Sequence, residues 1–232
     1  KKTAYGIYID NDTENSQIEN GTTGTINTSS TRTLTTESDG VIGDHVLLSS
    51  TGIALNRVMS NTPEVETSVK NSNEITAESI ANITADGQVT SGSIIANAKG
   101  VSINYLAGDI VYLAGDIVAE TTAEFENSGD ITATSKLDFV LNNTGELDDY
   151  NYGIEAEGDV YATATGLEID TNRATVDNTQ TGTISALAQI DIDGNGIVNG
   201  SYMYAQANGI KSYSSIEDTT LLSYGTIDAE AI

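Results

Sequence analysis

The stretch "ENSGDITATS", Glu126 to Ser135, contains the phrase that decides the fold, because related phrases occur five times along the chain. Each copy ends in an isoleucine that follows a turn rich in Gly, Asn and Thr. These isoleucines are Ile26, Ile75, Ile131, Ile184 and Ile227. They lie 43 to 56 residues apart. A long period of this kind is typical of stacked repeat architectures.

A second phrase, a glycine followed by Ile or Val, alternates with the first. Its glycines are Gly6, Gly52, Gly100, Gly153 and Gly209, which lie 46 to 56 residues apart. Glycine permits a bend at no steric cost, and the β-branched residue after it favours a strand. The chain therefore reads as about four and a half degenerate copies of one unit of about 50 residues.

These patterns predict an all-β fold, a parallel β-helix formed by one segment over residues 1–232. A unit of about 50 residues suits two rungs of about 25 residues, which gives about nine rungs and a rod of roughly 45 Å. The five isoleucines should form one column and the residues after the five glycines another, each on alternate rungs. An array of β-sandwich domains is the competing architecture.

The heptapeptide "YLAGDIV" occurs twice without change, at residues 105–111 and 112–118. Each copy carries the Gly-polar-Ile signal that precedes strands elsewhere in the chain. A rung needs about three times this length, so we expect the two copies to form successive sides of one coil. The duplication therefore indicates a copied part of the scaffold rather than a site.

The composition restricts the partners and the chemistry. The net charge of −25 repels phosphate backbones, so we expect no nucleic-acid partner. The absence of cysteine excludes disulfides and thiolate sites, and the single histidine excludes clusters of histidine ligands. No apolar stretch approaches the ~18 residues that a membrane helix needs, so we expect no membrane insertion by this segment.

The segments "AYGIYIDN" with "IENGTTGTINTSS", and "FENSGDITATS" with "NYGIEAEGDV", resemble the repeats of autotransporter passenger domains and related large bacterial surface adhesins. The resemblance implies a right-handed β-helix at the bacterial cell surface, with a stalk or adhesive role and a host-cell, glycan or matrix ligand. No catalytic residue carries over, which predicts a protein that is not an enzyme. A self-assembling filament or surface-layer subunit, and a β-helix polysaccharide-active enzyme, are the alternatives.

The chain begins and ends inside a repeat, without an evident polar cap. An open strand edge pairs readily with another strand. We therefore expect neighbouring repeats of a longer chain, or identical subunits stacked end to end, to cover both ends.

The segment "DIDGNGIVNGSY" is the sharpest motif for a ligand. Asp191, Asp193 and Asn195 match the first, third and fifth positions of a calcium-binding loop. Calcium is the one cofactor that the sequence suggests, although Tyr202 stands where the bidentate glutamate belongs. A tight turn between two strands is the alternative reading.

Two further sets of residues could carry chemistry. Asp148 and Asp149 form an acidic pair of the kind that glycoside hydrolases use, but consecutive strand residues face opposite ways. His45 follows Asp44, but a catalytic triad needs three converging groups. A solvated loop explains both sets as well.

Overall fold

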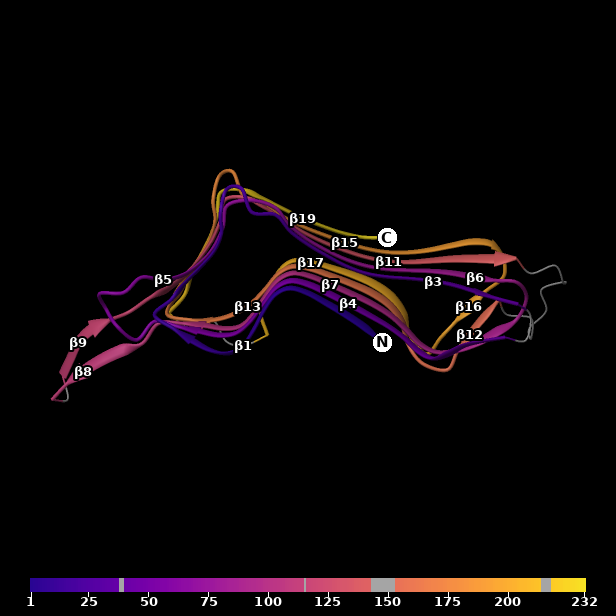
Figure 1. Cartoon of the computed structure of the whole chain (residues 1–232), viewed down its shortest axis with the longest axis horizontal. Helices are drawn as coiled ribbons and strands as arrows, with labels where there is room; N and C mark the ends of the chain where they lie inside the picture. Colours follow the sequence, from indigo (N-terminus) through magenta and orange to yellow (C-terminus); the bar gives the residue numbers. More distant parts are fainter. Residues whose placement is uncertain (38–39, 115, 143–152, 214–217) are drawn as a thin grey trace.

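The computed structural model of the chain describes residues 1–37, 40–114, 116–142, 153–213 and 218–232. Every regular element in these ranges is a β-strand, and parallel strands form three sheets, two of which face each other as opposite walls (Figure 1). The predicted all-β class and the parallel pairing are therefore confirmed.

The first sheet, which we call the bent sheet, contains the longest strands and curves toward its neighbour near its middle (Figure 1). Its strands are β1 (Lys2–Glu14), β4 (Gly40–Met59), β7 (Val89–Ala107), β12 (Ile154–Ala156), β13 (Val160–Asn172), β16 (Val198–Asn199) and β17 (Met203–Lys211). Both β12 and β13 pair with β7, so these two short strands together take the place of one long strand.

The other two sheets have one strand for each repeat. The narrow sheet contains β2 (Gln17–Asn20), β5 (Thr67–Asn71), β10 (Ala123–Asn127), β14 (Ala174–Asn178) and β18 (Thr220–Ser223). The flat sheet contains β3 (Ile26–Thr36), β6 (Ile75–Ala85), β11 (Asp130–Asn142), β15 (Thr183–Asn195) and β19 (Thr226–Ala231).

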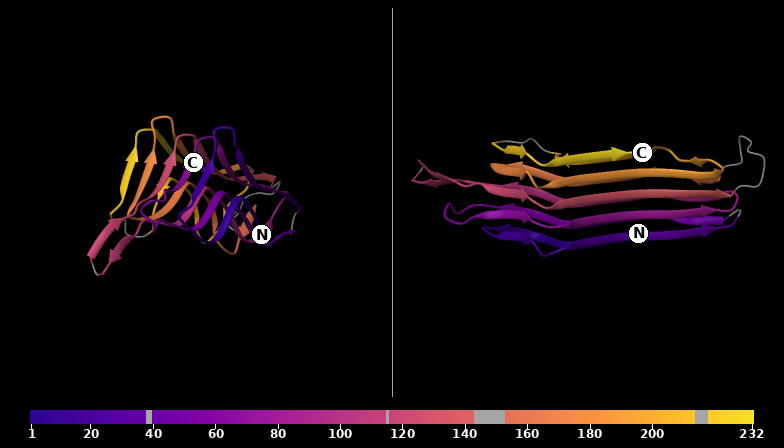
Figure 2. Two further views of the ribbon diagram at one scale, coloured as in Figure 1. Left: turned by 60° about the vertical axis from the view of Figure 1, so that its left-hand side comes forward. Right: turned by 90° about the horizontal axis from the view of Figure 1, so that it is seen from above.

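The chain visits the bent, narrow and flat sheets in turn, and each visit adds a strand beside the previous one. The described residues therefore form five layers, seen as stacked tiers in Figure 2. The expectation of two rungs per unit and about nine rungs is wrong, because each unit crosses every sheet once. Five layers at about 4.8 Å extend about 19 Å along the stack, not 45 Å.

The predicted isoleucine column is confirmed residue by residue, but on adjacent strands. Ile26 pairs with Ile75, Ile75 with Ile131, Ile131 with Ile184, and Ile184 with Ile227. The three inner members are fully buried. Burial of each stabilises the stack by about 1.5–3 kcal/mol.

The glycine column is confirmed at four of its five predicted positions. Gly6, Gly52, Gly100 and Gly209 precede residues that share one register column, but the fourth layer supplies Gly166 and Leu167 instead of Gly153 and Ile154. Ile154 pairs with Val89 and Val198 in a different column of the bent sheet. Gly153 has the expected sequence, a glycine followed by Ile, but lies outside the column. Gly166 lies in the column although the residue after it is a leucine.

The glycine and isoleucine columns lie on opposite walls of the stack and touch each other. A Cβ atom on Gly6, Gly52, Gly100, Gly166 or Gly209 would overlap the Cγ2 methyl of the isoleucine in the same layer. The two phrases were expected on successive rungs because a unit of about 50 residues suits two rungs of about 25 residues. They are instead the two halves of one contact, and that contact requires glycine at the closest approach of the sheets.

Each column glycine also bends its strand. Leu48 and Ser50 face the core before Gly52, and Ile53 and Leu55 face it afterwards, so the inward positions change from even to odd numbers at the glycine. Side chains on a regular strand alternate strictly. The strand therefore bends here, and the core divides into two buried clusters, one on each side of the glycine column.

A column of buried asparagines closes the turn between the narrow and flat sheets. Each side-chain amide donates to the Oδ1 atom of the next layer: Asn20 to Asn71 at 2.8 Å, Asn71 to Asn127 at 2.8 Å, and Asn127 to Asn178 at 2.9 Å. In the fifth layer Ser223 replaces asparagine and accepts from Asn178 at 3.5 Å. All donors thus point along the stack in one direction.

The duplicated heptapeptide does not form successive sides of a coil, and this expectation is wrong. Strands β8 (Ile110–Leu113) and β9 (Asp116–Glu120) pair antiparallel as a hairpin that projects from the third layer (Figures 1 and 2). In the first copy Leu106 and Ala107 are buried at the end of β7. In the second copy the equivalent alanine, Ala114, lies in the turn of the hairpin with φ of 53°. The same sequence takes two conformations because only the first copy can pair with the neighbouring layers.

The outermost layers each have one open edge within the described residues. Strands β1, β2 and β3 form one edge, and β16, β17, β18 and β19 form the other. Apolar side chains of the columns become accessible there, with Ile227 43% exposed and Leu221 52% exposed. A search of the described residues finds no helix with the length and apolarity to cross a membrane.

Candidate polar groove

The bend at the glycine column hollows the outer face of the bent sheet. The residue before each glycine and the second residue after it both face outward, on either side of the bend. In the second layer these are Thr51 and Ala54, which line a hollow of about 300 Å³. Thr51 is only 5% exposed although it lines this hollow.

Polar side chains occupy these outward columns at every layer, with Ala54 as the exception. The column before the glycines contains Tyr5, Thr51, Lys99, Thr165 and Asn208. The column after them contains Tyr8, Ala54, Ser102, Glu168 and Lys211. The columns run along the stack across β1, β4, β7, β13 and β17, and we call this strip of the outer face the groove. The hollow lies over the first three of these strands.

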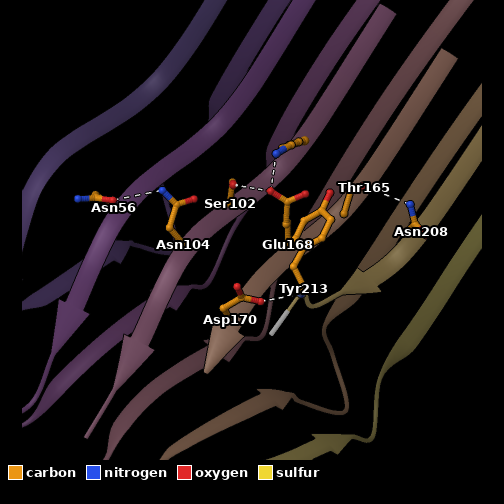
Figure 3. A network of polar contacts seen from close by, with 9 residues as sticks. Asn56, Ser102, Asn104, Thr165, Glu168, Asp170, Asn208 and Tyr213 are labelled. Atoms are coloured by element: carbon orange, nitrogen blue, oxygen red, sulfur yellow. Dashed lines mark hydrogen bonds and ion pairs between the residues drawn. The ribbon is translucent and has the colours of Figure 1, made fainter. Parts of the chain in front are cut away.

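A buried carboxylate lies at the centre of the groove (Figure 3). Glu168 is 8% exposed, and its Oε1 atom is paired with the Lys99 ammonium. Ser102 Oγ donates to the same oxygen at 3.2 Å. A buried charge is costly unless it is paired, and these two partners compensate Glu168 and fix its orientation.

Amide and carboxylate groups continue the polar wall on one side of Glu168 (Figure 3). Asn104 Nδ2 donates to Asn56 Oδ1 at 3.2 Å in the adjacent layer. Asp170 Oδ1 accepts from Ser212 Oγ at 3.0 Å and from the backbone N–H of Tyr213 at 2.7 Å. These hydrogen bonds link the second layer to the third and the fourth to the fifth.

Tyrosines lie at both ends of the groove. The rings of Tyr5 and Tyr8 stack at 4.7 Å in the first layer. A hydrogen bond to Asp10 raises the pKa of Tyr8 above its ordinary value, and desolvation and the charge of the same carboxylate act in the same direction. In the fifth layer the Lys211 ammonium lies 4.4 Å from the ring centre of Tyr213, which is 67% exposed.

The predicted calcium residues lie on the opposite wall, at the end of the flat sheet. Asp191, Asp193 and Asn195 belong to the extended strand β15, which bends at Gly194 with φ of 98°. The segment is therefore a strand end and not a helix-flanked loop. Among the described residues no group of three or more His, Cys, Asp or Glu side chains has the geometry to hold a metal ion. The calcium site stays a prediction.

Asp191 has partners within the protein. Gln189 Nε2 donates to it at 2.8 Å, and Lys136 Nζ lies 3.2 Å away. Partial burial acts to raise the pKa of Asp191, but these hydrogen bonds and the lysine charge together outweigh it, so the pKa is lowered. Hydrogen bonds to Asp138 and Asp191 raise the pKa of Lys136 in return. Lys136 thus supplies a positive charge beside Asp191 from within the protein.

The other two predicted sets are an acidic pair and His45. Asp148 and Asp149 lie outside the described residues, so the polysaccharide-active alternative stays a prediction. His45 belongs to β4, where its Nδ1 accepts a hydrogen bond from the backbone N–H of Ser93 at 3.1 Å. It lines a hollow of about 450 Å³ together with Glu157.

The sequence patterns missed the groove residues, above all Lys99 and Glu168. The signal that could have found them is a polar residue directly before each column glycine and, except at Ala54, two positions after it. No protein-family model matches the chain, and the comparisons found no similar curated protein and no similar solved structure.

Proposed function

We propose that the chain is a structural segment of an extracellular bacterial surface protein, in which stacked layers of a right-handed parallel β-helix form a stiff acidic stalk. The observation that carries the proposal is the repetition of the same columns through consecutive layers. Parallel pairing with a crossover through two other sheets favours the right-handed form. The net charge of −25 keeps such a surface hydrated and soluble.

The open edges support continuation of the stack. The fifth layer presents Ile227, Leu221 and Ile210 at the positions that Ile26, Ile18 and Ile7 occupy in the first. A further layer stacked on either edge would therefore extend the apolar columns in register. In repeat proteins of this kind, stability arises from such interfaces between neighbours.

The asparagine column also supports continuation of the stack at both edges. Its donors point toward the fifth layer, so the Asn20 Oδ1 atom faces the open edge of the first layer. Ser223 accepts from Asn178 and has its hydroxyl proton available for an acceptor in a following layer. One edge thus offers a donor and the other an acceptor, which suits head-to-tail continuation.

A tandem protein tests the proposal. Two copies of the chain are joined head to tail by a short flexible linker, and thermal unfolding is followed by circular dichroism. We expect one cooperative transition at a higher Tm than that of the single chain, because joining the copies covers two edges. Two independent transitions, or one at the Tm of the single chain, would contradict the proposal.

A matched control separates stacking from simple linkage. Ala229→Pro in the first copy places a residue without an N–H on the open strand β19, where it obstructs pairing with the second copy. The same substitution is measured in the single chain to subtract its local cost. The gain in Tm should disappear in the tandem variant.

Assembly of separate copies into a filament is the second candidate function. The same complementary edges favour it, and the two candidates differ in whether the next layer belongs to the same chain. Sedimentation of the single chain over a range of concentrations distinguishes them, since a filament subunit grows in mass with concentration.

A further inference from the structure

We propose that the groove on the outer face of the bent sheet binds an extended, uncharged oligosaccharide that lies along the stack, across the strands. This inference does not depend on how the stack continues at its edges, because the groove lies within one chain. It rests on the shape of the groove, its charge balance and its hydrogen-bonding groups.

The shape suits a linear ligand. The groove follows the glycine column, and the layer spacing repeats the same two outward positions every 4.8 Å or so. Its floor is preformed, since Thr51, Ser102, Thr165 and Glu168 are all at most 8% exposed. A preformed floor lowers the entropic cost of binding because few side chains need to be ordered.

The charge balance suits an uncharged ligand. Lys99 and Lys211 stand against Asp10, Glu168 and Asp170 in and beside the groove, so the groove is close to neutral in a chain of charge −25. Lys99 and Glu168 moreover neutralise each other. Neither a polyanion nor a metal cation would find a cluster of charges of the opposite sign there.

The hydrogen-bonding groups suit sugar hydroxyls, each of which both donates and accepts. The groove offers ammonium and amide donors beside carboxylate, amide and hydroxyl acceptors, as at Lys99 with Glu168 and at Asn104 with Asn56 (Figure 3). Tyr213 adds an exposed ring face near one end, against which the apolar face of a sugar ring can stack.

A peptide strand suits the groove less well. Peptides commonly bind sheets by pairing with a free edge, where backbone N–H and C=O groups are open. The groove lies on the face of the sheet, and its backbone groups pair between layers. Recognition must therefore come from side chains.

The test uses the intact chain and four linear hexasaccharides: cellohexaose, maltohexaose, xylohexaose and, as the charged comparison, hexagalacturonic acid. Binding is measured by calorimetry and by tyrosine fluorescence, which is usable because the chain has no tryptophan. We expect at least one uncharged hexasaccharide to bind, and more tightly than the acidic one.

Two substitutions with matched controls locate the binding. Asn104→Ala and Tyr213→Ala should each weaken binding roughly five- to tenfold, the loss of one hydrogen bond or one ring contact. Asn27→Ala, on the outer face of the flat sheet, and Tyr224→Ala, an equally exposed tyrosine of the fifth layer, should leave it unchanged. All four replace accessible side chains, so circular dichroism should confirm that each variant folds.

Three results would overturn the proposal. They are no binding of any uncharged hexasaccharide at millimolar concentration, binding of the acidic saccharide alone, and binding that Asn104→Ala and Tyr213→Ala leave intact. The last result would place the saccharide elsewhere on the surface.

Discussion

The contact between the glycine and isoleucine columns predicts a large cost for one added methyl group. In Gly100→Ala the new Cβ atom would overlap the Cγ2 methyl of Ile131 and would lie 2.7 Å from the backbone oxygen of Gly166 in the next layer. Overpacking of this kind costs about 1–3 kcal/mol. We expect a value in the upper part of that range, because one obstructing atom belongs to the backbone of a paired strand.

The partner of the contact can be tested in a double-mutant cycle. Ile131→Ala removes the Cγ2 methyl, so Gly100→Ala should cost about 1 kcal/mol less in that background than in the native chain. The remaining cost reflects the Gly166 oxygen. Ile131→Val keeps both γ-carbons and should give no such relief.

The assay is urea unfolding followed by circular dichroism, with the free energy of unfolding compared at constant m. Gly21→Ala is the matched control, since a Cβ atom there would meet only the Glu19 side chain at 3.8 Å. It should leave stability unchanged or raise it by up to about 1 kcal/mol. A cost below about 0.5 kcal/mol for Gly100→Ala, or an equal cost in the Ile131→Ala background, would refute the contact.

Three further perturbations follow from the layers. Asn127→Ala should lower the free energy of unfolding by about 2 kcal/mol or more in urea titrations, because it leaves buried amide partners unpaired on both sides, whereas the exposed Asn27→Ala should change it by less than about 0.5 kcal/mol. Replacing Ile110–Glu120 by a short Gly linker should leave the urea midpoint nearly unchanged, since the hairpin pairs mainly with itself; a large drop would show that it supports the stack. Lys136→Met should raise the lowered pKa of Asp191 toward its ordinary value, and carboxyl NMR measures this titration. In the native chain the ionised Asp191 stabilises the fold at pH above the ordinary pKa, and this stabilisation is lost as the pH falls through the lowered pKa. A pKa of Asp191 that stays the same in Lys136→Met would contradict the pairing.

The sequence repeats predicted correctly which residues form the columns, except at Gly153, but they did not predict the path that the chain takes between the columns. The isoleucine column was predictable because a turn and a β-branched residue recur together at every layer. The number of layers was not, since local sequence does not show whether 25 residues close a turn or cross to the opposite wall. That information lies in the contact of Gly52 with Ile75, which joins two phrases of the same unit.

The groove was not predictable from strand periodicity, for a related reason. Lys99 and Ser102 are three residues apart, and a regular strand would place them on opposite faces. The bend at Gly100 brings both to the outer face, where they pair with Glu168 of the next layer. Polar residues that show no regular spacing along the chain are therefore aligned in columns across the layers.

One distance tests the central claim that each unit of about 50 residues forms one layer. Asn27 in the first layer and Asp228 in the fifth face outward in the same column of the flat sheet, and both are exposed. Because the chain has no cysteine, nitroxide labels on Asn27→Cys and Asp228→Cys would mark only these two sites. Double electron–electron resonance should give a distance near 19 Å, four layer spacings; a distance near 38 Å, as two rungs per unit would require, would contradict the claim.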